Sequence, residues 1–288
     1  MQTAVDFDKT CAVDDFVRTK FRLLFARADD RWLQKLFGQF DDFFAGRTTD
    51  YAPIDLHYHN LRHTLMATGC MADLLEGINA TEGVAHLSSR DFELAIAAVL
   101  LHDSGYLKLR SDTEGTGAKY TYCHITRSCA FAASYLPQLG VTVTETENVI
   151  SAINCTGPYS EIHRLKFSDE AGRTLGCALA TSDYVGQLSD PHYPDKLSEL
   201  YQEFCESDTY SNVPTERRMF KSECDLVLRT PAFWRNFVRP KLEKDFDSVY
   251  RYLARPVGST SNAYMDAIEA NFAKIEQRIA AMAPPSRS

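Results

Sequence analysis

The stretch AIAAVLLHDSGY, residues 95–106, joins an apolar helical segment to a pair of polar side chains. Its small and aliphatic residues leave no polar face, and a helix that is apolar on nearly all sides is buried. His102 and Asp103 follow directly, and burying an imidazole beside a carboxylate costs free energy unless partners compensate for it. Ser104 and Gly105 then end the helix. The stretch predicts a buried helix that delivers a His–Asp pair to a polar site, although a satisfied core histidine would give the same local pattern.

Composition and charge restrict the class of protein. Of 288 residues, 44% are hydrophobic and 24% are charged, as in ordinary soluble globular proteins. The net charge of −8 argues against a broad nucleic-acid-binding surface. No apolar run reaches the roughly 20 residues that a transmembrane helix requires. The N-terminal residues lack the layout of a signal peptide, and the eight cysteines form no CxxC pair. We therefore expect a cytoplasmic protein with reduced cysteines and no membrane partner.

Hydrophobic residues recur with helical periodicity along most of the chain, and no convincing pair of strands is visible. No linker or internal repeat divides the sequence, so we expect one all-α domain over residues 1–288. The helical segments expected from the periodicity are residues 13–46, 55–75, 91–106, 122–136, 144–157, 171–188, 197–205, 231–253 and 263–282.

A second histidine-bearing segment, YHNLRH at residues 58–63, lies at the start of the predicted apolar helix 55–75. His59 and His63 are four residues apart, so in a helix they would share one face. Two such histidines can bind one metal ion, or act as one ligand and one nearby proton donor. His57 lies in the segment that leads into the helix and is not expected in the site. Two partly buried histidines without a metal would show the same spacing.

Two more polar residues fall in predicted apolar helices. His124 lies in the first turn of 122–136, and Asp183 interrupts the small-residue helix 171–188. A buried aspartate without a partner is rare. Mixed imidazole and carboxylate donors suit Mn, Fe, Co, Ni or Zn, whereas carboxylates alone favour Mg or Mn. The candidate set is His59, His63, His102, Asp103, His124 and Asp183.

The order His63, His102–Asp103, Asp183 resembles the H…HD…D signature of the HD-domain superfamily of metal-dependent phosphohydrolases. YHNLRH is similar to the YHNxxH motif of cyclic-nucleotide phosphodiesterases, a branch of that superfamily. The likeness covers about residues 55–190. It implies an all-α HD-domain helical bundle with extra helices, which are an N-terminal cap at about 13–50 and a C-terminal region at about 195–283.

The resemblance also implies roles for individual residues. His63, His102, Asp103 and Asp183 would hold a divalent transition metal, and His59 would protonate the leaving oxygen, as general acids do. Asp103 would bridge to a second metal, such as Mg, for which His124 matches a further ligand. The implied reaction is attack of a metal-bound hydroxide on the phosphorus of a small phosphorylated substrate, a nucleotide or related phosphoester.

Two positions depart from the patterns of related proteins. Tyr106 stands where many HD proteins have a phosphate-binding lysine, so Arg62, Lys108 or Lys119 would have to bind the substrate phosphate. Asn154 lies in the region where two-metal HD proteins carry a further histidine. We therefore expect one firm metal site and a weak or absent second site.

Two other functions are compatible with the same residues. HD-type di-iron oxygenases hold two irons with four histidines and two aspartates, and Asn154 counts against that ligand set. A non-catalytic HD-fold binding or sensor protein would retain the fold without the chemistry, and the intact set of four ligands argues against it. The long amphipathic helices near the C-terminus are compatible with a homodimer.

Overall fold

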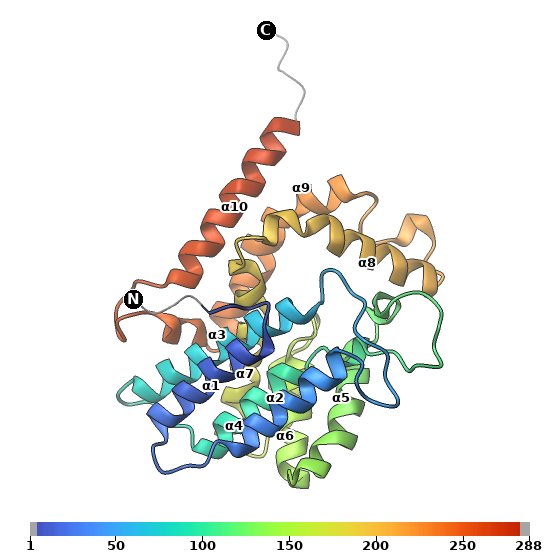
Figure 1. Cartoon of the computed structure of the whole chain (residues 1–288). Coiled ribbons are helices and arrows are strands. Elements are labelled where there is room, and N and C mark those ends of the chain that lie inside the picture. The colour runs from blue at the N-terminus through green and yellow to red at the C-terminus, as the bar shows by residue number, and fades with distance from the viewer. Residues whose placement is uncertain (1–4, 283–288) are drawn as a thin grey trace.

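The computed structural model describes residues 5–282, and α-helices dominate this part of the chain (Figure 1). Residues 5–282 contain no strand, and their only β-type pairing is an isolated bridge between Tyr51 and Leu109. The prediction of an all-α fold is confirmed. The helices are α1 Thr10–Leu24, α2 Arg31–Phe44, α3 Leu61–Ala80, α4 Ser89–Leu101, α5 His124–Tyr135, α6 Val143–Cys155, α7 Glu170–Ser189, α8 Leu197–Tyr210, α9 Glu223–Phe233 and α10 Ala263–Met282.

The most deeply buried helices form the centre of the bundle. α3 packs along α7, and α4 and α6 also pack against α7. α1 and α2 contact each other and cover α3 and α4 from one side. α8 and α9 form the opposite end of the molecule, and α10 packs on α7 and α9 before projecting away from the body (Figure 1). No helix within residues 5–282 is long and apolar enough to cross a membrane.

Local sequence signals determine where helices α3 and α4 begin. A capping box between Ser88 and Asp91 starts α4, and its apolar residues are buried up to Leu101, where α4 ends. Asn60 caps α3 by accepting a hydrogen bond from the backbone N–H of His63. Because α3 begins after Asn60, His59 lies in the preceding non-helical segment. The expectation that His59 and His63 share one helix face is therefore wrong.

A close helix crossing aligns α3 with α7. A Cβ atom on Gly186 would lie 2.9 Å from the Cα atom of Ala67, so only glycine permits this approach of the two backbones. His63 lies one turn before Ala67, and Asp183 lies about one turn before Gly186. The crossing therefore brings His63 and Asp183 together inside the bundle.

A second glycine contact fixes the turn that follows α4. Ser104–Tyr106 forms a short 3₁₀ turn, and the backbone N–H of Gly105 donates to Ser128 Oγ of α5 at 2.8 Å. A Cβ atom on Gly105 would lie only 1.9 Å from the carbonyl oxygen of His124. The glycine thus lets the turn press against the first turn of α5, which places Asp103 beside His124.

Gly105→Ala is expected to destabilise the protein, because the added methyl group would collide with backbone atoms that cannot move independently. Overpacking of this kind typically lowers the free energy of unfolding by about 1–3 kcal/mol. Urea denaturation measures the loss. Gly38→Ala is the matched control, since no atom lies within 4 Å of its added Cβ and alanine favours helix α2 by up to about 1 kcal/mol. Equal midpoints for the two variants would contradict the argument.

Two expected helical segments are interrupted. The expected continuous helix over 13–46 is wrong, because α1 ends at Leu24 and α2 begins at Arg31. Between them the carboxylate of Asp29 accepts a hydrogen bond from the backbone N–H of Arg31, and local bonds of this type compete with a helix.

The single long helix expected over 231–253 is also wrong. α9 ends at Phe233 and is followed by π-helical turns at Trp234–Val238 and Lys241–Asp245 and a 3₁₀ turn at Val249–Leu253. Pro240, which has no backbone N–H, separates the two π-helical turns.

Candidate metal centre

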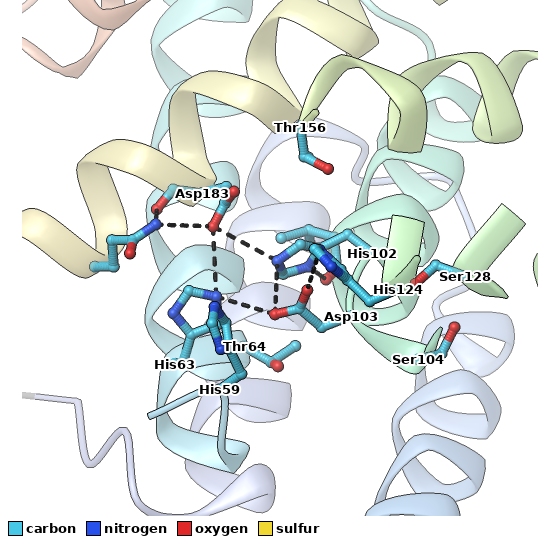
Figure 2. Close-up of polar contacts among 12 residues, drawn as sticks. His59, His63, Thr64, His102, Asp103, Ser104, His124, Ser128, Thr156 and Asp183 are labelled. Carbon is cyan, nitrogen blue, oxygen red and sulfur yellow. Dashed lines mark hydrogen bonds and ion pairs between the residues drawn. The ribbon is translucent and has the colours of Figure 1, made fainter. Parts of the chain in front are cut away.

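Four side chains from three parts of the bundle converge at one buried point (Figure 2). His63 comes from α3, His102 and Asp103 follow α4, and Asp183 comes from α7. Asp103 Oδ2 lies 3.1 Å from His63 Nε2 and 3.2 Å from His102 Nε2. Asp183 Oδ1 lies 3.4 and 3.6 Å from the same two nitrogens. Residues separated by up to 120 positions are thus brought together as the sequence order suggested.

Three of the four residues in this cluster have a buried ligand atom without a hydrogen bond. His63 Nε2, His102 Nε2 and Asp103 Oδ2 are buried and make no hydrogen bond. These three residues offer ligand atoms that all lie within 4.8 Å of one another. Leaving buried polar groups unsatisfied costs about 1–3 kcal/mol each. Imidazole nitrogens and carboxylate oxygens around a common centre form a donor set for a divalent transition metal, so the residues fit such an ion.

The histidine rings are held so that Nε2 faces the cluster. His102 Nδ1 lies 2.7 Å from the carbonyl oxygen of Val99. A carbonyl can only accept, so Nδ1 carries a hydrogen, and Nε2 is the ring atom left to hold either a second proton or a metal ion. His124 Nδ1 lies 2.7 Å from the carbonyl oxygen of Thr121 in the same manner. Backbone partners of this kind orient histidines that bind metals.

The electrostatics of the cluster call for positive charge at its centre. Burial by itself would disfavour charge on each group, but the neighbouring opposite charges outweigh it. The two carboxylates raise the pKa of His63 to about 9 and hold the pKa of His102 well above its usual range. The histidines in turn lower the pKa values of Asp103 and Asp183. Either protons on the imidazoles or a bound cation can supply this charge.

His124 lies on the other side of Asp103. Its Nε2 atom is 3.7 Å from Asp103 Oδ1, the oxygen that does not face His63 and His102. Burial lowers the pKa of His124, which favours the neutral ring that a metal ligand needs. Asn154 donates its amide to the carbonyl oxygen of Ile150 on its own helix. A second ion beside Asp103 would therefore have His124 as a ligand, while the amide of Asn154 is engaged within α6.

His59 is held by a residue that the sequence analysis did not identify. Its Nδ1 atom lies 2.6 Å from Glu203 Oε2 of α8, and the carboxylate must accept from Nδ1–H. Glu203 Oε1 accepts the backbone N–H of Tyr58 at 2.7 Å. The His59 ring also stacks on Tyr106 at 4.9 Å between centroids and lies 5.3 Å from the His63 ring. His59 thus lies beside the cluster although it is not on α3.

The aromatic ring of Tyr106 contacts the rings of two histidines. Its ring stacks on His124 at 4.6 Å and on His59 at 4.9 Å. The centroids of the two histidine rings are 6.3 Å apart. Two rings on opposite faces of a tyrosine, each at a contact spacing of about 3.5 Å, would be separated by about 7 Å or more. Both histidines therefore lie on the same face of Tyr106. Tyr106, at the position where the resemblance would place a lysine, thus offers an aromatic ring that stacks on His59 and His124.

The three cationic side chains expected to bind phosphate are already paired with carboxylates. Their partners are Asp190 and Asp8 for Arg62, Asp55 for Lys108, and Asp112 for Lys119. Within residues 5–282, none of the three makes a hydrogen bond or ion pair with the four-residue cluster. Phosphate binding by these cations stays a prediction, and a substrate would have to compete with their carboxylate partners.

Comparisons with known proteins support the fold. A family model described as Npun_R2479-like matches residues 44–277. The structure is similar to a crystal structure of the phosphodiesterase domain of the RhoPDE fusion protein from the choanoflagellate Salpingoeca rosetta, with a TM-score of 0.63 and 15% identity over 98% of this chain and 93% of that chain. A second structure of the rhodopsin phosphodiesterase domain from this organism gives a TM-score of 0.59 and 16% identity over 97% and 89% of the two chains. No curated protein sequence matches the chain.

Proposed function

Because this chain belongs to the Npun_R2479-like family and shares the fold of phosphodiesterase domains, we propose that it is a metal-dependent phosphohydrolase of the HD-domain type that cleaves a phosphodiester. The observation that carries the proposal is the group of buried donor atoms on His63, His102 and Asp103 that have no hydrogen-bond partner. Asp183 of α7 adds a second carboxylate, whose Oδ1 lies 3.4 Å from His63 Nε2 and 3.6 Å from His102 Nε2. A divalent transition metal bound there would polarise the phosphoryl group and activate water for attack.

His59 is the proposed proton donor to the leaving oxygen. Glu203 accepts from Nδ1–H and so fixes the ring, which leaves Nε2 as the atom that can reach a substrate. The stacked ring of Tyr106 restrains the same imidazole from its face. An alkoxide is a poor leaving group without a proton, and a positioned acid contributes about 10²–10⁴-fold to such a step. Glu203 and Tyr106 are positioning residues in this scheme.

The charges around the site favour a substrate with few negative charges. Arg62, Lys108 and Lys119 form ion pairs with carboxylates. Glu203 and Asp183 add negative charge near the cluster. A phosphodiester carries one negative charge, whereas a nucleoside triphosphate carries several that would need free cations. We therefore expect a small nucleotide-type phosphodiester rather than a polyphosphate.

Metal reconstitution tests the proposal. The protein would be stripped with a chelator and reloaded separately with Mn, Fe, Co, Ni, Zn or Mg. Each sample would then be assayed with bis(4-nitrophenyl) phosphate and with cyclic and linear dinucleotides and mononucleotides. We expect hydrolysis of at least one phosphodiester that depends on a transition metal. A fully loaded protein that cleaves none of them would overturn the proposal, as would O₂ consumption by a two-iron form without hydrolysis.

A further inference from the structure

A glutamine outside the four-residue cluster contacts one of its carboxylates directly. Gln187 lies one turn after Asp183 on α7, so the two side chains share one face of the helix. Gln187 Nε2 donates to Asp183 Oδ1 at 3.2 Å and to the Asp183 carbonyl oxygen at 3.1 Å. Asp183 Oδ1 is also the oxygen that faces His63 and His102. The amide therefore holds the atom that points toward the centre of the cluster.

Tyr58 determines which way this amide faces. The hydroxyl of Tyr58 donates to Gln187 Oε1 at 2.8 Å, so the NH₂ group of the amide is directed toward Asp183. A flipped amide would place its oxygen against the carboxylate of Asp183, which is unfavourable. Burial raises the pKa of Tyr58 well above its usual range, so the phenol stays protonated and remains a donor.

Tyr58 is itself held in place from the other side of the site. Its side chain is buried, and its backbone N–H donates to Glu203 Oε1. The adjacent His59 pairs with Glu203 Oε2. A continuous series of hydrogen bonds thus runs from Asp183 through Gln187 and Tyr58 to the glutamate that holds His59.

We propose that Gln187 is a positioning residue that sets the metal affinity of the site by holding Asp183 Oδ1 toward His63 and His102, with its amide oriented by Tyr58. The inference rests on the proposed metal-dependent function. Asp183 reaches the cluster from the middle of a helix, and its carboxylate can rotate unless a donor restrains it. Partners that orient metal ligands typically contribute 10–100-fold to metal affinity.

Metal titration of the whole chain tests this inference. The apo protein would be titrated with Mn²⁺ and with Zn²⁺ in competition with a chelating dye. We expect Gln187→Leu, which removes the donor at similar volume, to bind 10–100-fold more weakly than the wild type. Tyr58→Phe should weaken binding less. Because Tyr58 acts through Gln187, the double variant should bind no more weakly than Gln187→Leu alone.

A second tyrosine–glutamine pair, elsewhere in the chain, provides a matched control. Tyr135 of α5 donates its hydroxyl to Gln39 Oε1 of α2 at 2.7 Å, and this pair makes no hydrogen bond to the cluster. Gln39→Leu and Tyr135→Phe remove the same chemistry and should leave metal affinity unchanged. Circular dichroism and thermal unfolding of each apo variant would establish that it is folded.

The outcomes separate this inference from the proposed function. A wild-type protein that binds no metal defeats the proposed function and the inference together. A wild-type protein that binds metal, with Gln187→Leu binding equally well, overturns the inference alone. If Gln187→Leu does not fold, Tyr58→Phe decides the question, because it deletes one oxygen atom. An unchanged affinity in that variant would overturn the inference, which requires the hydroxyl to orient the amide.

Discussion

Asp103→Asn is expected to abolish metal-dependent phosphodiester hydrolysis. Asp103 Oδ2 faces His63 and His102, and its Oδ1 faces His124, so this carboxylate is shared by every histidine proposed as a ligand. An amide has no negative charge and binds a divalent transition metal poorly. Loss of a partner that only orients a ligand costs 10–100-fold, so loss of a ligand should cost more than about 10²-fold. Initial rates on a phosphodiester, measured at saturating metal, give the value.

A second carboxylate serves as the control for this change. Asp30 is partly buried and forms ion pairs with Arg18 and Arg22 in the N-terminal part of the chain. Asp30→Asn removes a comparable charge and should affect the stability of the protein rather than its turnover rate. Retention of wild-type activity in Asp103→Asn would show that this aspartate does not serve the reaction.

His59→Gln is expected to act selectively on substrates with poor leaving groups. If His59 gives a proton to the leaving oxygen, hydrolysis of diesters with alkoxide leaving groups should slow by about 10²–10⁴-fold. Hydrolysis of bis(4-nitrophenyl) phosphate should change little, because 4-nitrophenolate leaves without a proton. The two kcat/KM values, measured for the wild type and the variant, give the comparison.

Glu203→Gln extends the same test to the residue that fixes His59. The introduced side-chain amide can still form a hydrogen bond with the His59 ring or with Tyr58, but its oxygen is a weaker acceptor than a carboxylate. We expect a smaller loss than for His59→Gln, again confined to poor leaving groups. Equal losses on both classes of substrate would mean that His59 and Glu203 support binding or structure and not proton transfer.

The residues of the cluster were accessible to sequence reasoning because each breaks a strong local pattern. His102 and Asp103 end an apolar run that is buried along its length in the structure. Asp183 interrupts a helix of small residues, where a charged side chain must have partners. The structure brings these three together with His63, and their role as metal ligands stays a prediction.

The wrong expectation that His59 and His63 share a helix face has a physical cause, and the sequence contains a signal for it. A spacing of four residues places two side chains on one face only if the helix includes both. Asn60, a favoured N-cap residue, directly follows His59 and caps α3, so the helix begins at Leu61. The two rings nevertheless meet, because Glu203 and Tyr106 fix His59 from outside the helix.

The residues that the sequence did not reveal depend on contacts between distant elements. Glu203 lies on the amphipathic helix α8, where glutamates usually face water, yet it is buried and bonded to Tyr58 and His59 in the segment before α3. Gln187 follows Asp183 by one turn, but its partner Tyr58 is more than 120 positions away. Such long-range hydrogen bonds leave no periodic pattern in a single sequence.

Elemental analysis of the purified wild-type protein shows whether His63, His102, Asp103 and Asp183 hold a metal ion. The protein would be prepared without added metal or chelator and analysed beside His63→Ala and Asp183→Ala. We expect close to one tightly bound transition metal per chain in the wild type, and its loss in both variants. A wild-type protein without metal, even after incubation with Mn, Zn and Fe, would show that these four residues do not form a metal site.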